Sequence, residues 1–216
     1  MKIGILGTGM VGSTIGSKLI ALGHDVMMGS RTSTNEKAAA WVKSAGAKSS
    51  AGTFAEAAAF GEVIFNCTKG DATLDVMKLA GEKNLAGKIL LDISNPLDFS
   101  KGMPPFLIPS LSNTNSLGEE IQKQFPATKV VKTLNTMNCN LMVDASLVAG
   151  EHDVFLCGND DGAKQKVKEI LGWFGWKNPI DIGDLTGARA TEMMLPIWLK
   201  LWGVNQTPNF NFKIVK

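Results

Sequence analysis

The chain has 216 residues, of which 44% are hydrophobic and 19% are charged, and its formal net charge is +2. This composition predicts a globular protein with a core of ordinary size, and the absence of any long basic block argues against nucleic acid or an anionic membrane as a partner. The most apolar stretch near the C-terminus, 193–202, is interrupted by a proline and a lysine and is too short to span a bilayer.

Short apolar runs alternate with longer amphipathic segments, which is typical of a parallel sheet flanked by helices. We expect a strand at 2–6, a helix at 10–22, a strand at 25–28, a helix at 34–45, a weak strand at 47–50 and a helix at 53–59. There follow a strand at 62–68, a helix at 72–81, a strand at 88–94, a loop at 99–115, a helix at 117–125 and a strand at 129–134. The remainder adds a strand at 154–157, a helix at 163–172, a strand at 179–182, a helix at 186–203 and a tail at 205–216 that we expect to pack on a neighbour.

The first turn of the chain matches the pattern G-x-G-x-x-G, directly after an apolar strand and at the start of a helix. Its residues are Gly7, Thr8, Gly9, Met10, Val11 and Gly12. The first glycine permits a tight turn, the second lets the backbone approach a pyrophosphate, and the third lets the helix pack close to the strand. The helix start adds free amides and a positive dipole end. The turn therefore predicts a dinucleotide site in a Rossmann-type fold, a doubly wound, mostly parallel α/β sheet with helices on both faces.

The end of the second strand distinguishes the two nicotinamide cofactors, because an acid there would bind the ribose 2′-hydroxyl of NAD and repel the 2′-phosphate of NADP. The chain has Ser30, Arg31 and Thr32 at this point and no acid. Hydroxyls and a guanidinium suit a 2′-phosphate, at about 1.5–3 kcal/mol for a charge-assisted hydrogen bond. Lys37 is a further candidate contact. The sequence therefore predicts NADP(H) rather than NAD(H).

Polar residues also follow three later strands, at the edge where a Rossmann sheet binds the rest of its cofactor. They are Thr68, Lys69, Ser94, Asn95, Asn135, Thr136 and Met137. We expect them to touch the ribose or nicotinamide, although Thr68, Ser94 and Asn135 are equally typical of ordinary turn caps. No Ser/His/Asp or Cys/His set is evident, so we name no catalytic residue.

Cysteine and histidine are scarce. The three cysteines, Cys67, Cys139 and Cys157, show no close pairing, and two of them lie in apolar runs, so we expect free thiols and a reducing, cytoplasmic location. The two histidines, His24 and His152, lie in separate segments, so no metal site is expected.

With these motifs, nearly the whole chain resembles the coenzyme F420-dependent NADP oxidoreductases, and it is similar to the cytosolic domain of the STEAP ferric reductases. The likeness lies in residues 7–12, 29–31, 130–136, 157–161, 181–185 and 187–189. It implies hydride transfer between the nicotinamide and the ring of a deazaflavin or flavin, with the protein acting as a template. It also implies that residues 8–11 and 30–31 hold NADP(H) and that residues 135–137 lie beneath the two rings.

Two departures from the family pattern lie near the expected acceptor site. Lys69 and Gly70 stand where F420-reducing members tend to have Pro-Trp, and Asn135 stands where one branch has histidine. The hydride acceptor, a small molecule, is therefore left open among coenzyme F420, a flavin and a ferric chelate.

Two other functions fit the sequence. A β-hydroxyacid dehydrogenase or pyrroline-carboxylate reductase would share the opening motif, but such folds add a large helical domain and only about eighty residues follow Thr136. An NADP(H)-binding redox sensor without turnover is compatible with every motif, because binding motifs do not report catalysis. We divide the chain into an NADP-binding core at 1–137 and a C-terminal α/β extension at 138–216, and the apolar terminal helix, with Trp198 and Trp202, predicts a homodimer.

Overall fold

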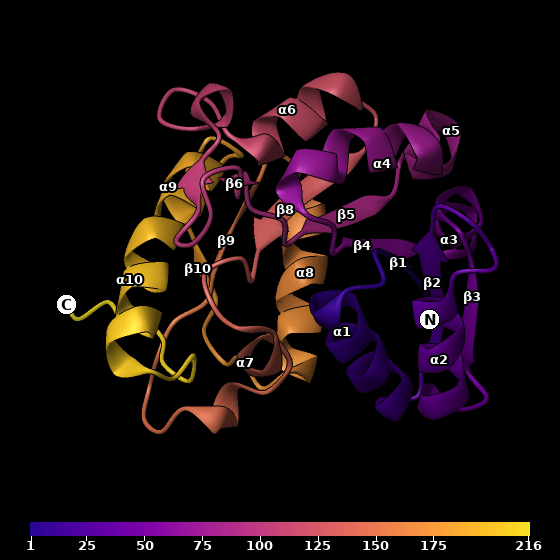
Figure 1. Cartoon of the computed structure of the whole chain (residues 1–216), viewed down its shortest axis with the longest axis horizontal. Coiled ribbons are helices and arrows are strands. Elements are labelled where there is room, and N and C mark those ends of the chain that lie inside the picture. Colours follow the sequence, from indigo (N-terminus) through magenta and orange to yellow (C-terminus); the bar gives the residue numbers. More distant parts are fainter.

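Eight strands form one sheet in the computed structural model, which describes residues 1–216 (Figure 1). They are β1 (Lys2–Leu6), β2 (Asp25–Ser30), β3 (Ser49–Thr53), β4 (Val63–Asn66), β5 (Ile89–Asp92), β8 (Lys129–Thr133), β9 (Phe155–Gly158) and β10 (Ile180–Asp181). Their order across the sheet is β10-β9-β8-β5-β4-β1-β2-β3, and every pair is parallel except β8 with β9. The fold is therefore the doubly wound, mostly parallel Rossmann type that the sequence predicts.

Helices cover both faces of this sheet (Figure 1). One face packs against α1 (Met10–Ala21), α2 (Glu36–Ala45), α7 (Cys139–Val143) and α8 (Asp161–Trp173). The other packs against α3 (Phe54–Phe60), α4 (Thr73–Ala80), α5 (Glu82–Leu85), α6 (Leu117–Gln124) and α9 (Gly187–Met193), and α10 (Leu195–Asn205) follows α9. Two hydrophobic cores result, of 27 and 17 buried residues, one on each side of the sheet.

Short elements complete the chain. A separate antiparallel pair joins β6 (Leu97–Asp98) to β7 (Phe106–Leu107), and three 3₁₀ turns lie at Gly70–Ala72, Pro109–Leu111 and Ala145–Leu147. The sequence patterns do not predict β6, β7, α5 or α7, which have two to five residues each. No helix is both long enough and apolar enough to cross a membrane.

One expectation near the C-terminus is wrong in detail. The single helix expected at 186–203 is two helices joined at Met194, because Pro196 has no amide to donate to the carbonyl of Glu192. The tail after α10 packs on its own chain, where Phe210 stacks on Trp198 with ring centroids 5.6 Å apart, and its expected contact with a neighbour stays a prediction.

Candidate functional site

The turn between β1 and α1 has close backbone contacts at its first and third glycines and open space at its second. Gly7 has φ +122°, and a Cβ there would lie 2.7 Å from the carbonyl oxygen of Cys67. A Cβ on Gly12 would lie 2.3 Å from the carbonyl oxygen of Gly7, whereas one on Gly9 would meet nothing within 4 Å. The backbone at Gly9 therefore faces open space, as the approach of a ligand requires.

The start of α1 offers hydrogen-bond donors without acceptors. The amides of residues 8–12 have no hydrogen-bond partner in the protein. The first backbone hydrogen bond of the helix runs from the amide of Ser13 to the carbonyl of Gly9, at 3.0 Å. No side chain caps the helix and no acid lies in its first turn. These free amides and the positive end of the helix dipole make an anion-binding surface.

The end of β2 lies beside this turn, because the amide of Gly7 donates to the carbonyl of Gly29 at 3.1 Å. The hydroxyl of Ser30 is buried and donates to the carbonyl of Thr32 at 2.6 Å, so its remaining capacity is as an acceptor. Arg31 and Thr32 are exposed.

Arg31 has neither an ion pair nor a hydrogen bond in the structure. The only other arginine of the chain, Arg189, binds both carboxylate oxygens of Glu119, one of them at 2.8 Å. Lys37 is exposed in the first turn of α2, beside a surface hollow between α1 and α2. Arg31 is thus a guanidinium free to bind an anion at the edge of the glycine turn.

A buried network supports the carboxyl ends of β4 and β5. Asn66 accepts a hydrogen bond from the hydroxyl of Thr68 at 2.7 Å and donates to Asp92 at 2.7 Å. The hydroxyl of Ser94 donates to the same carboxylate oxygen at 2.6 Å. Thr68 and Ser94 are therefore held in place by Asn66 and Asp92, both fully buried, and neither of these two residues is among the predicted site residues.

Lys132 extends this network across β8. Its ammonium lies 2.8 Å from a carboxylate oxygen of Asp92 and 2.7 Å from one of Glu192, and it also donates to the carbonyl of Ser94. All three charged side chains are at most 1% exposed. Burial acts to lower the pKa of Lys132, but the two carboxylates outweigh it and the pKa is raised, so the lysine stays charged. Burial raises the pKa of Glu192, against the opposing effect of Lys132.

The loop after β8 is fixed against the loop after β5. Leu134 is buried in the left-handed region with φ 61°. Asn135 and Asn95 hold each other reciprocally, each side-chain amide donating over 2.9 Å to an oxygen of the other residue. Thr136 and Met137 are buried just beyond. The structure thus brings these residues to the same edge of the sheet as the glycine turn.

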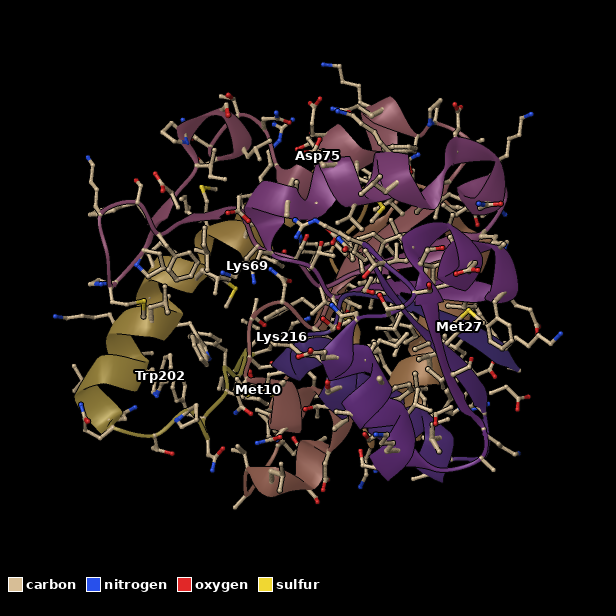
Figure 2. All side chains as sticks on the ribbon, turned by 45° about the vertical axis from the view of Figure 1, so that its right-hand side comes forward. Met10, Met27, Lys69, Asp75, Trp202 and Lys216 are labelled. Atoms are coloured by element: carbon tan, nitrogen blue, oxygen red, sulfur yellow. The ribbon has the colours of Figure 1, made fainter.

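The departure from the family pattern after β4 has a steric basis. A Cβ on Gly70 would lie 2.0 Å from the carbonyl oxygen of Asn95, so a side chain as large as tryptophan does not fit this backbone. Lys69 is exposed, with its ammonium 5.8 Å from the ring centroid of Phe99. Figure 2 shows Lys69 and Met10, which is 75% exposed, around the middle of the molecule, with Trp202 on α10 toward the outside.

The site has limited means for acid–base or thiol chemistry. All three cysteines are free, and burial raises the pKa of Cys157 to about 12. No group of three His, Cys, Asp or Glu side chains is arranged to hold a metal ion. The arrangement can bind and orient ligands, and the charged side chains beneath it are committed to one another.

Comparisons with known proteins agree with this geometry. Residues 2–96 match the family described as NADP oxidoreductase, coenzyme F420-dependent. The chain is 33% identical over 202 residues to Metalloreductase STEAP3 of Rattus norvegicus, a match that covers 91% of this chain and 38% of that protein. It is 28% identical over 148 residues to the F420-dependent NADP reductase of Methanocaldococcus jannaschii, covering 68% and 64%. The chain therefore spans less than two thirds of either curated relative.

Solved structures extend the likeness to the full chain. The crystal structure of a candidate F420-dependent NADP reductase from Arthrobacter sp. FB24 superposes with a TM-score of 0.94 and 49% identity, over 100% of both chains. A Streptomyces aurantiacus imine reductase superposes with a TM-score of 0.66 at 16% identity, over 95% of this chain and 63% of that one, which shows the fold alone. The chain belongs to the family of coenzyme F420-dependent NADP oxidoreductases.

Proposed function

We propose that the chain is an oxidoreductase that binds NADP(H) across the start of α1 and the end of β2 and transfers hydride to or from a planar acceptor. The observation that carries this proposal is the pairing of free amides at residues 8–12 with the unpartnered Arg31 beside them. The amides suit a pyrophosphate and the guanidinium suits a 2′-phosphate. Thr68, Ser94, Asn95 and residues 135–137 would then line the ribose and nicotinamide.

The acceptor in this proposal is coenzyme F420 or a flavin, and the protein acts by holding two rings in register. One relative is an F420-dependent NADP reductase and another is a metalloreductase, which supports both a deazaflavin and a metal-reducing route. Gly70 gives the site a different wall from one built with tryptophan, and this favours testing flavins beside F420.

The cofactor part is tested with Arg31→Ala. We expect NADPH binding to weaken by about tenfold to a hundredfold and NADH binding to change by less than about twofold, because only NADPH carries the 2′-phosphate. Lys43→Ala removes an exposed cation from the last turn of α2 and serves as the charge-matched control. Equal losses for both cofactors would contradict the 2′-phosphate role.

The turnover part is tested by following NADPH oxidation with F420, FMN, FAD, riboflavin and a ferric chelate offered separately. Turnover with F420 or a flavin supports the proposal. Tight NADPH binding with no oxidation by any acceptor would favour a redox sensor, which the same binding geometry would serve equally well.

We also propose a homodimer built on the outer face of α9 and α10. Met193 at the end of α9 is 40% exposed, and on α10 Ile197, Trp202 and Val204 are 54%, 39% and 67% exposed. Such an apolar stripe is typical of a subunit contact. Light scattering should give twice the chain mass of 23.0 kDa, and Ile197→Glu should return the protein to the monomer mass. A monomeric wild-type protein would refute this assembly.

A further inference from the structure

The C-terminal tail, defined here as residues 207–214, is hydrogen-bonded at two places. One is residues 152–153, just before β9, and the other is Asn138, beyond the end of β8. The carbonyl of Phe212 accepts from the amide of Asp153 at 2.9 Å. Asn211 donates to the carbonyl of Asp153 at 2.8 Å and to the ring of His152 at 2.9 Å. The amide of Ile214 donates to the carboxylate of Asp153. The tail is thus an ordered strap that begins where α10 ends.

One end of this strap reaches the loop that follows the proposed nicotinamide floor. The side-chain amide of Asn138 donates to the carbonyl of Pro208 at 2.6 Å. Its side-chain oxygen accepts from the amides of Asn140 and Leu141, at 2.9 and 3.2 Å, and so caps α7. Asn138 therefore uses one end of its amide for the helix and the other for the tail.

This double use matters because residues 135–137 immediately precede Asn138. On one side the loop is held through the reciprocal bonds between Asn135 and Asn95. On the other side it is held by Asn138, whose position depends on both α7 and Pro208. A segment clamped at both ends keeps one conformation, and release of one clamp widens the range of conformations that it samples.

We infer that Asn138 is a positioning residue through which the C-terminal tail sets the loop 135–137, and with it the alignment of nicotinamide and acceptor. This inference rests on the proposed function for its catalytic consequence. The mechanical coupling between tail and loop stands on the contacts alone and can be measured without any ligand.

The coupling is tested with variants that weaken the contacts at one end of the tail, while hydrogen exchange is measured at the other end. Asn138→Asp keeps a capping oxygen for α7 but sets a carboxylate oxygen against the carbonyl of Pro208. We expect hydrogen exchange at the amides of Asp153 and Ile214 to accelerate by at least about fivefold. In the other direction, the double variant Phe210→Ala/Asn211→Ala removes the stacking on Trp198 and the two side-chain hydrogen bonds of Asn211 to residues 152–153. It should accelerate exchange at the amides of Asn140 and Leu141 by a similar factor.

Asn209→Asp is the matched control, because it places the same negative charge in the tail and keeps the oxygen that faces Asn138 at 3.4 Å. It should leave both sets of amides unchanged. Unchanged exchange at Asn140 and Leu141 in the tail double variant would overturn the coupling, whatever the activity of the protein.

The catalytic consequence is read as a split between rate and binding. Asn138→Asp and the tail double variant should each lower kcat for hydride transfer by about tenfold, with the Kd for NADPH within about twofold, and their combination should fall no further than either alone. Coupled exchange with an unchanged kcat would overturn the positioning role. If none of the acceptors offered supports NADPH oxidation by the wild type, the proposed function fails. The hydrogen-exchange experiment still decides whether tail and loop are coupled.

Discussion

Replacing Lys132 by methionine removes the single cation from a buried cluster with two carboxylates. Lys132, Asp92 and Glu192 are at most 1% exposed, and the ammonium lies within 2.8 Å of both acids. Removing one partner of a buried ion pair costs about 3–5 kcal/mol, because an uncompensated charge stays in the interior. That is a large share of the roughly 5–15 kcal/mol that stabilises a typical domain.

The two carboxylates of this variant should not respond equally. Asp92 retains hydrogen bonds from the side chain of Asn66 and from the amide and hydroxyl of Ser94. Glu192 retains the amides of residues 117 and 118, and burial already raises its pKa. We therefore expect Glu192 to take up a proton in the variant. A carboxyl whose folded pKa lies above its unfolded value favours folding below the unfolded pKa, and that contribution is lost as pH rises through the folded pKa. The variant should thus lose stability as pH rises.

Urea unfolding followed by tryptophan fluorescence measures the loss, at several pH values and with unchanged m-values as the test of two-state behaviour. The double variant Lys132→Met/Glu192→Gln removes the acid left without its cation and should recover part of the stability. A loss below about 1 kcal/mol for Lys132→Met, the range of an exposed pair, would refute the reasoning. So would a double variant less stable than the single one.

Three further outcomes are expected. Gly9→Ala should fold normally, because its Cβ meets nothing within 4 Å, but it should bind NADPH at least about tenfold more weakly. Gly12→Ala should lose about 1–3 kcal/mol of stability, because its Cβ would lie 2.3 Å from a carbonyl oxygen. Thermal melts measure the loss of stability, and NADPH titrations measure the loss of binding. Cys157, whose pKa is raised to about 12, should escape alkylation near pH 8 in the native protein and react only on unfolding, as followed by mass spectrometry. The hydrogen bond from Arg189 lowers the pKa of Glu119 below its usual 4.5. The stabilising contribution of this pair is therefore present above that value and is lost as pH falls through the folded pKa. Arg189→Gln should lower Tm more near neutral pH than near pH 3, and equal shifts at both pH values would contradict this.

Elements that depend on interactions between residues close in sequence can be predicted from local sequence patterns. The strand at Lys2–Leu6 and the helix from Met10 follow from an apolar run, a glycine turn and an amphipathic segment, and the structure has both. Four of the five residues of the strand Ser49–Thr53 are small and have little β propensity, so local patterns predict it only weakly. Its place beside β2 comes from backbone pairing along five residues. The antiparallel entry of β9 is a property of the chain path around residues 134–154 and leaves no mark in the strand itself.

The site divides in the same way. The roles of the glycine turn and of Arg31 depend on residues adjacent in sequence, and these positions can be named before the fold is known. Lys132 looks like one polar residue in an apolar strand, because its partners Asp92 and Glu192 lie forty and sixty residues away. Asn138 likewise looks like an ordinary helix cap, and its bond to Pro208 spans seventy residues. A single sequence carries no signal for such pairs, which only the tertiary contact defines.

The strand order also describes how the protein can be assembled as it is synthesised. From β1 the chain first lays down β2 and β3 outward on one side. It then adds β4, β5, β8, β9 and β10 one after another on the opposite side. Each strand therefore emerges from the ribosome when the edge it pairs with already exists, so a nascent chain never waits for a later segment to fill a gap in the sheet. The open edge moves steadily toward the C-terminus, and it is an unpaired edge of this kind that recruits other chains into aggregates. Pauses in translation between β5 and β8 would prolong the exposure of β5, in which three of four residues are apolar, as an unpaired edge.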